Sequence, residues 1–332
     1  MKYKQWLFYS FVTIIILLGI IVSLMYWSDT YSTFHPKRVK FYTEPNTRVS
    51  KIEYILENKD KYDSFIFGSS RVSAYNPSNI KNGTYYNMTV SEGIPHEYLL
   101  NIRLLLTSGI KIKNMIIALD EFSYKVSFEQ HQKQGLTKLH YLSTNTNKVV
   151  YFVDNFLRFP LGEDRRHILK KIKRSNEFFI TDISTQKQNY LNRKLSEKAL
   201  NLNTPTHLNS SVFDKHLSYN GFFLNSTIDD IKKIKNICNQ SKINCLFFIN
   251  PIHKTNYQHL DQINFNNFKK ELSYITDYYD FSKPHYINNS NQFWYETSHF
   301  TLEVGDLILD KIYYNKDPYK YGKYISIQKK GE

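Results

Sequence analysis

Two short polar motifs far apart in the chain contain the residue types of a nucleophilic active site. GSSR at 68–71 follows the apolar run FIF at 65–67, and ETSH at 296–299 lies far downstream. A serine attacks a carbonyl carbon when a histidine accepts its proton and an acid orients that histidine. The acid-x-x-His spacing lets Glu296 reach the Nδ1 side of His299 and leaves Nε2 for the serine. The pair therefore predicts acyl-transfer chemistry.

Each motif also has a simpler structural interpretation. A serine after a strand is more often a helix cap, and a histidine near a helix start is more often structural. The chain has no GxxxxGK[ST] loop and no GxSxG elbow, which disfavours a nucleotide P-loop and an ordinary α/β-hydrolase. The catalytic hypothesis therefore depends on the two motifs meeting in space.

The elements that would position these motifs alternate along the chain. Apolar runs predict strands at 62–68, 84–90, 113–119, 246–250 and 278–281. Helical spacing predicts helices at 49–58, 95–108, 265–275, 301–313 and from 227 onward, with Thr301 as an N-cap. This succession indicates an α/β fold with a mostly parallel sheet in three layers. The carboxyl end of a strand, where Ser70 lies, is the usual ligand position in such a sheet.

The segment 6–27, WLFYSFVTIIILLGIIVSLMYW, carries no charged residue and has aromatic residues at both ends. Its length suits a transmembrane helix better than a cleaved signal peptide, whose apolar stretch is about 7–15 residues. We therefore expect an uncleaved signal-anchor.

Basic residues flank this span on both sides. Lys2 and Lys4 favour a cytoplasmic N-terminus, whereas Lys37, Arg38 and Lys40 pull the other way. Because a short N-terminal anchor usually exports the large domain behind it, we expect a single-pass cell-membrane protein with an extracytoplasmic C-terminal domain.

The expected organisation has four parts. Residues 1–28 form a cytoplasmic stub and anchor, 29–48 a juxtamembrane stalk, 49–320 the α/β domain and 321–332 a tail. Within the domain, 121–225 is interpreted as an insertion or cap. It contains the basic stretch DRRHILKKIKR at 164–174, either a solvated face or a contact with lipid headgroups or an anionic polymer.

The charge and the cysteines restrict the class of protein further. The formal net charge of +14 suggests an anionic environment, and no zinc-finger or RNA-binding motif indicates nucleic acid. The two cysteines, Cys238 and Cys245, flank a predicted helix–strand corner. They are either a disulfide or two buried thiols. Two cysteines with no paired ligands nearby disfavour a zinc site. We expect no metal and no cofactor.

At this point the sequence resembles the SGNH (GDSL-type) hydrolases, in particular the membrane-anchored branch of polysaccharide O-acetylation and teichoic-acid D-alanylation factors. The family's first block is Gly-Asp-Ser; here Ser70 takes the nucleophile position and Ser69 replaces the acid. The last block, Asp-x-x-His, corresponds to Glu296 and His299. FTLEVGDLILDKI at 300–312 is similar to the helix that ends these domains.

The middle blocks of the family match less well. Thr89 stands where the second block has an oxyanion-hole glycine, with Gly93 nearby, and Asp120 falls where the third block has an asparagine donor. A carboxylate cannot donate unless it is protonated. The resemblance therefore implies that the Ser70 and Thr89 amides are the oxyanion donors. It also implies either slow activity or a hole completed by a partner.

Two further residues are candidates for substrate binding. Arg71 either binds a carboxylate or phosphate of the substrate or ties down a loop. His253, which follows another strand end, is a substrate ligand, an alternative base or a neutral surface histidine.

The resemblance implies an O-acyltransferase or O-acyl esterase that acts on a cell-surface polysaccharide through a Ser-His-Glu triad. Its partners would be the glycan, an acyl donor, membrane lipid and a multi-span membrane acyltransferase. The alternative is a catalytically weak glycan-binding or scaffold protein that docks on such an acyltransferase.

Overall fold

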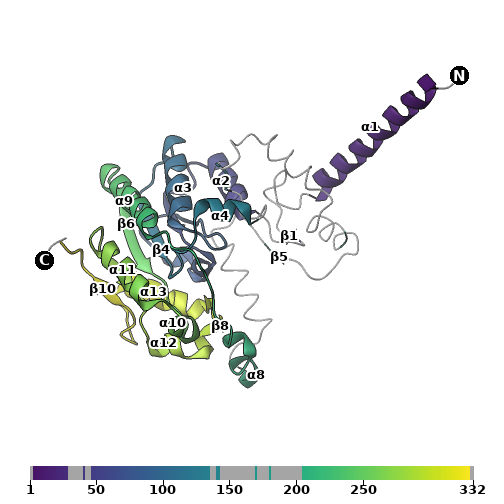
Figure 1. Cartoon of the computed structure of the whole chain (residues 1–332). Helices are drawn as coiled ribbons and strands as arrows, with labels where there is room; N and C mark the ends of the chain where they lie inside the picture. The colour runs from purple at the N-terminus through teal and green to yellow at the C-terminus, as the bar shows by residue number, and fades with distance from the viewer. Residues whose placement is uncertain are drawn as a thin grey trace.

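The computed structural model describes residues 3–28, 40–41, 46–134, 140–142, 169, 179–180 and 204–329. Most of the predicted insertion at 121–225 lies outside these residues, as does the basic stretch 164–174 apart from Leu169. The described chain has an N-terminal helix and an α/β domain (Figure 1).

A mostly parallel six-stranded sheet forms the centre of the domain, in the order β10-β7-β6-β4-β2-β3. Only β10 runs antiparallel to its neighbour. The strands are β2 (Ser64–Phe67), β3 (Tyr85–Asn87), β4 (Asn114–Leu119), β6 (Asn244–Ile249), β7 (Tyr278–Asp280) and β10 (Lys323–Ile325). The α/β class and the mostly parallel sheet are thereby confirmed.

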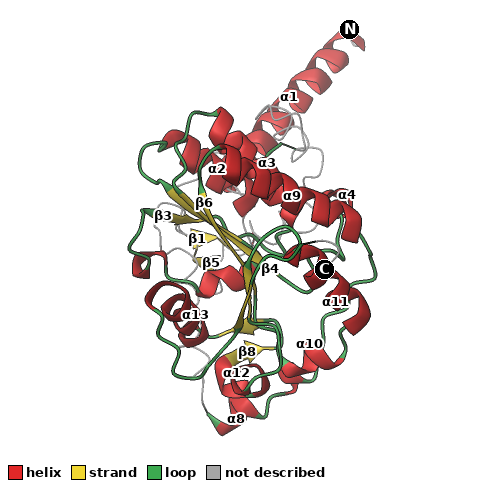
Figure 2. Ribbon diagram, turned by 90° about the vertical axis from the view of Figure 1, so that its left-hand side faces the viewer, coloured by secondary structure: helices red, strands yellow, loops and turns green. Residues whose placement is uncertain are grey.

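Alternate side chains of the strands enter two separate cores, as the two-residue period of a strand requires. Phe65 and Phe67 face one core, and Ile66 between them faces the other. Four helices cover the first face: α2 (Thr47–Glu57), α3 (Pro95–Thr107), α9 (Leu224–Gln240) and α11 (Gln262–Ser273). The second face is covered by α13 (Leu302–Tyr314), the 3₁₀ turn η1 (Ser70–Ala74) and the hairpin β8 (Trp294–Glu296) and β9 (His299–Phe300). The sheet therefore lies between two covering layers (Figure 2).

Short elements complete the described chain. They are β1 (Lys40–Phe41), β5 (Phe179–Ile180), α4 (Phe128–Lys133), α8 (Pro205–Leu208), α10 (Lys254–Gln258), α12 (Tyr286–Asn289), η2 (Pro77–Asn79), η4 (Ser211–Phe213) and η5 (Asn291–Phe293).

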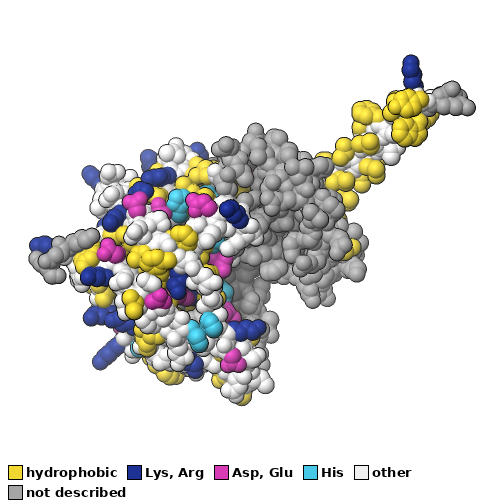
Figure 3. Space-filling model, in the orientation of Figure 1, with side chains coloured by type: hydrophobic (Ala, Val, Ile, Leu, Met, Phe, Trp, Pro, Cys, Tyr) yellow, Lys and Arg dark blue, Asp and Glu magenta, His cyan; other side chains and the backbone are white. Residues whose placement is uncertain are grey.

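The N-terminal helix α1 (Tyr3–Ser28) projects away from the α/β domain (Figure 1). It contains one segment, Tyr3–Leu24, that is long and apolar enough to cross a membrane, and none of that segment is buried against the domain. At about 1.5 Å per residue, α1 exceeds the ~30 Å hydrocarbon core of a bilayer. Its apolar surface contrasts with the mixed charged surface of the domain (Figure 3).

Three details differ from the expectations. The segment interpreted as a stalk is partly structured, because Lys40–Phe41 pairs with β5 and α2 begins at Thr47 behind a buried Asn46 cap. The segment interpreted as a tail contributes β10, whose short pattern gave no strand signal. Thr301 does precede α13, but its hydroxyl is buried and caps no amide.

The two cysteines form a disulfide, which resolves the alternative left open by the sequence. Cys238 lies in the last turns of α9 and Cys245 in β6, with their Cα atoms 6.1 Å apart. The bond ties the helix–strand corner together beside the sheet.

We predict that replacing both cysteines by serine lowers the free energy of unfolding by about 2 kcal/mol, because the bond closes only a short loop. Urea unfolding of the full chain in detergent, followed by tryptophan fluorescence, measures this difference. Reductant should destabilise the wild type and leave the double variant unchanged. Equal stability of the two proteins would show that the bond contributes nothing.

Candidate active site

The structure brings the two predicted motifs into direct contact. Ser70 Oγ lies 2.7 Å from His299 Nε2. On the other side of the imidazole, Nδ1 is hydrogen-bonded to Glu296 Oε1. With the Nδ1 proton facing Glu296, Nε2 accepts from the serine hydroxyl, which is the arrangement a general base needs.

The serine belongs to a tight turn between β2 and η1. A side chain at Gly68 would meet Val72 Cγ2 at 1.9 Å, so the turn requires glycine there. The Ser69 hydroxyl caps η1 by accepting from the Arg71 amide at 3.3 Å, while Ser73 Oγ donates to the Ser70 carbonyl at 2.6 Å. Ser69 thus has the capping role, and Ser70 is left to face the histidine.

The base and the acid belong to the β8–β9 hairpin. Its residues Trp294 and Phe300 are buried in the second core. Asn256 Nδ2 donates to the Thr297 carbonyl at 2.7 Å, and the Thr297 hydroxyl donates to the Lys215 carbonyl at 2.7 Å. The hairpin turn at Thr297 is therefore hydrogen-bonded to two neighbouring segments, one at Asn256 and one at Lys215.

The environment of Glu296 favours its ionised form. Burial alone would raise the pKa of Glu296, but the hydrogen bond and charge of His299, with the Ser298 amide at 2.6 Å, outweigh burial and lower it. The side chains of Glu296 and His299 are 34% and 32% exposed, so a substrate has access to the pair.

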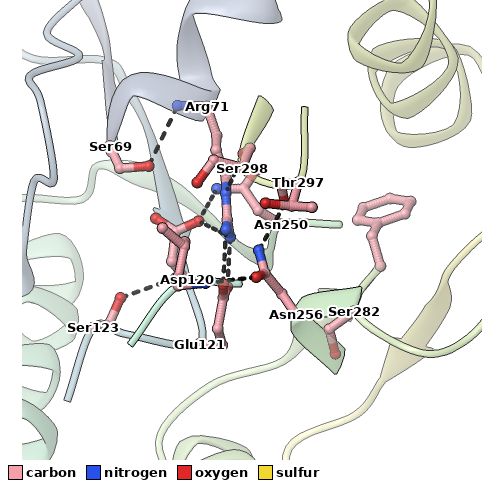
Figure 4. Close-up of polar contacts among 12 residues, drawn as sticks. Ser69, Arg71, Asp120, Glu121, Ser123, Asn250, Asn256, Ser282, Thr297 and Ser298 are labelled. Carbon is pink, nitrogen blue, oxygen red and sulfur yellow. Dashed lines mark hydrogen bonds and ion pairs between the residues drawn. The ribbon is translucent and has the colours of Figure 1, made fainter. Parts of the chain in front are cut away.

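Behind the serine, the buried guanidinium of Arg71 joins three segments (Figure 4). Its Nε donates to the Ser298 carbonyl at 2.8 Å. Its terminal nitrogens donate to Asp120 Oδ1 at 3.0 Å and to Glu121 Oε1 at 2.7 Å. Burial would lower the pKa of Arg71, but the adjacent carboxylates of Glu121 and Asp120 raise it, so the cation is permanent.

These contacts decide between the two interpretations of Arg71. The side chain is 1% exposed and its donors are engaged by protein groups, so it ties down the site from within. Of the two alternatives that the sequence left open, the contacts therefore favour the one in which Arg71 ties down a loop, and not the one in which it binds substrate.

Asp120, predicted near the oxyanion hole, belongs to the same buried network. Its Oδ1 accepts from both Arg71 and Asn250 Nδ2, the latter at 2.9 Å, and Tyr75 donates to Asn250 at 2.8 Å. Burial raises the pKa of Asp120, Arg71 opposes this and Glu121 adds to it. Asp120 thus supports Arg71 through Oδ1, which accepts both of these hydrogen bonds.

The structure also changes the predicted roles of Thr89 and Gly93. The Thr89 amide donates to Asn87 Oδ1 at 2.9 Å, so the donor expected for an oxyanion is already used inside its own loop. The Thr89 hydroxyl donates to the Ser69 carbonyl instead. A Cβ on Gly93 would lie 2.8 Å from the Gly68 carbonyl oxygen, so glycine permits this loop to pack against the turn that carries Ser70.

His253 is neither a surface histidine nor a substrate ligand. It is fully buried, its Nε2 lies 3.1 Å from Asn291 Oδ1, and its Nδ1 accepts from the Thr255 amide at 3.2 Å. Burial lowers the pKa of His253 to about 4, so it is neutral. It caps α10 and packs against Trp294.

Several residues at the site were missed by sequence reasoning. Glu121 lies two residues after β4 and Asn250 directly follows β6, and polar residues at the carboxyl ends of parallel strands were the available signal. No comparable signal singled out Lys51, which is buried in α2. Among the described residues, no group of three His, Cys, Asp or Glu side chains is placed to hold a metal ion.

Neither the family models nor the curated proteins compared with the chain gave a match.

We predict that Arg71→Met lowers the free energy of unfolding by about 3 kcal/mol, because it leaves Asp120 and Glu121 buried beside no cation. Arg71→Lys should cost less, since it keeps the charge but not the fork of donors. Urea unfolding measures both. The matched control is Arg103→Met on the exposed face of α3, which should change stability by less than about 0.5 kcal/mol. A similar small effect at Arg71 would contradict its role as the link between the segments.

Proposed function

We propose that this protein is a membrane-anchored, SGNH-like acyl-group enzyme that uses Ser70, His299 and Glu296 as a catalytic triad. The observation that carries the proposal is the 2.7 Å contact between Ser70 Oγ and His299 Nε2 at the carboxyl end of the parallel sheet. Together with the Glu296 contact to Nδ1, it supplies the nucleophile–base and base–orienter hydrogen bonds that such a site needs.

The reaction would proceed through an acyl-enzyme. Ser70 Oγ attacks the acyl carbonyl carbon while its proton passes to His299 Nε2, which gives a tetrahedral intermediate. The bond to the leaving oxygen then breaks, and His299 returns the proton to that oxygen. Water or a glycan hydroxyl next gives its proton to His299 and attacks the carbonyl carbon of the acyl-enzyme. The bond between that carbon and Ser70 Oγ then breaks, and His299 returns the proton to Ser70 Oγ. Water completes an esterase cycle and a glycan hydroxyl completes an acyl transfer.

Glu296 has an electrostatic role in this cycle. Its Oε1 accepts from His299 Nδ1 and its Oε2 from the Ser298 amide, so the carboxylate is held in one orientation. An ionised Glu296 stabilises the imidazolium that forms when Ser70 loses its proton.

The resemblance to SGNH hydrolases supports the assignment through the order and place of the motifs. Ser70 follows β2 near the beginning of the domain, and Glu296-x-x-His299 precedes the last helix, α13. The departures lie in the two middle blocks, where Thr89 and Asp120 are committed to other bonds. Those departures are the observation that favours the second candidate, a catalytically weak scaffold for a multi-span membrane acyltransferase.

The anchor and the disulfide support an extracytoplasmic domain. Disulfides persist in oxidising compartments, and Cys238–Cys245 is on the domain side of α1. A +14 chain on that side suits an anionic polysaccharide or lipid headgroups. We therefore propose a cell-surface polysaccharide as the acceptor or substrate.

The test is hydrolysis of p-nitrophenyl acetate by the full chain in detergent. Ser70→Ala and His299→Ala should each lower kcat/KM by at least ~10³-fold, since each removes a member of one catalytic unit. Ser78→Ala, at an exposed serine in the neighbouring turn, is the matched control and should retain the wild-type rate. Equal rates in all four proteins would overturn the catalytic assignment for simple esters and favour the scaffold.

A further inference from the structure

Two buried basic side chains of α2 hold the loop that packs against the turn carrying Ser70. Lys51 Nζ donates to the carbonyls of Asn87 at 2.9 Å and Thr89 at 2.6 Å. Arg48 Nη2 donates to the Ser91 carbonyl at 2.6 Å. The exposed fractions of Lys51 and Arg48 are 1% and 2%, so these contacts lie inside the domain.

The bonded carbonyls belong to alternate residues, which has a consequence for the amides between them. In a planar trans peptide, the carbonyl of one residue points opposite to the N–H of the next. The Met88 and Val90 amides accordingly point to the other side and donate to the carbonyls of Ile66 at 2.8 Å and Gly68 at 3.3 Å.

Glu92 is the next residue in the series of amides, after Met88 and Val90. Ser70 is the next residue in the series of carbonyls, after Ile66 and Gly68. Because Arg48 holds the Ser91 carbonyl, the peptide unit that follows directs the Glu92 N–H away from α2, toward the end of β2. The loop and β2 run in parallel register, with Ile66 opposite Asn87. The last contact of the series joins the Val90 amide to the Gly68 carbonyl, and Ser70 and Glu92 are each two residues further along their segments.

The backbone makes a tight turn at this point. Glu92 has φ of 51°, in the left-handed region that non-glycine residues rarely adopt. The Gly93 amide closes the turn on the Val90 carbonyl at 3.3 Å.

The burial of Lys51 adds an independent argument. Burial lowers the pKa of Lys51 to about 7. In the described part of the chain, its Nζ is bonded to the two loop carbonyls and to no carboxylate. An ammonium buried away from a carboxylate is costly. Arg48, by contrast, is paired with Glu97 at 2.7 Å. The carbonyls of Asn87 and Thr89 are therefore the acceptors that satisfy the buried amino group of Lys51.

We propose that Lys51 and Arg48 are positioning residues that hold the 87–92 loop with the Glu92 N–H turned toward the acyl oxygen at Ser70. Glu92 then supplies the oxyanion donor that Thr89 cannot, and α2 acts on the reaction only through the loop. The proposal rests on the proposed function, since it assigns an oxyanion site to the same serine.

Two readouts on the full chain in detergent test the proposal. One is amide hydrogen exchange of the peptide covering 86–94, and the other is p-nitrophenyl acetate hydrolysis. The variants are Lys51→Met, which removes two donors, and Arg48→Lys, which keeps a cation beside Glu97. The matched control is Lys59→Met, because exposed Lys59 also donates to a backbone carbonyl, that of Ser108 at 2.8 Å.

In both test variants we expect the 86–94 peptide to exchange ~10-fold faster or more. We also expect kcat to fall by ~10–100-fold, with KM changed by less than about threefold, because an oxyanion donor acts in the transition state. Lys59→Met should match the wild type in both readouts.

The two readouts separate the possible failures. Unchanged exchange in Lys51→Met and Arg48→Lys overturns the proposal, whatever the activity. Faster exchange with unchanged kcat shows that the cations hold the loop but do not position a catalytic donor, which also overturns it. A wild type without esterase activity, beside variants with faster exchange, refutes the proposed function and leaves only the structural role of the cations.

Discussion

The described site depends on one buried guanidinium. Arg71 is adjacent in sequence to Ser70, and its Nε holds the carbonyl of Ser298, the residue before His299. The same guanidinium is bonded to Asp120 and Glu121 at the end of β4. A charge with 1% exposure is tolerated only if its donors are satisfied, so the three segments must be correctly placed together. The geometry of Ser70 and His299 is thereby coupled to the packing of the sheet.

Around Arg71, the turn that carries Ser70 is fixed from two further directions. The loop after β3 packs on it through the Thr89 hydroxyl and the Val90 amide, and α2 supports that loop with Lys51 and Arg48. From the opposite face, α13 approaches so closely that a Cβ on Gly305 would lie 2.1 Å from the Ala74 carbonyl oxygen. A small turn enclosed in this way can keep a serine in one orientation, which is what a preorganised nucleophile requires.

The sequence was informative where one local pattern determines the outcome. Five strands were predicted because buried parallel strands are continuous apolar runs. The contact between Ser70 and His299 was predicted because a serine after a strand and an acid-x-x-His motif before the last helix are the parts of one triad. Long-range polar pairing was not predictable in this way. Nothing local indicates that Arg71 would be buried against Glu121, that the Thr89 amide would be used by Asn87, or that residues 323–325 would add a strand. Each of those outcomes depends on a partner brought close only by the completed fold.

The central claim is that Ser70 is a nucleophile activated by His299. The most direct measurement is reaction of the full chain with a fluorophosphonate, followed by mass spectrometric mapping of the adduct. The account predicts one adduct on the peptide containing Ser70, carried by Ser70 and not by Ser69, with labelling strongly slowed in His299→Ala. An adduct on another serine, or equal labelling of Ser70 in wild type and His299→Ala, would contradict it.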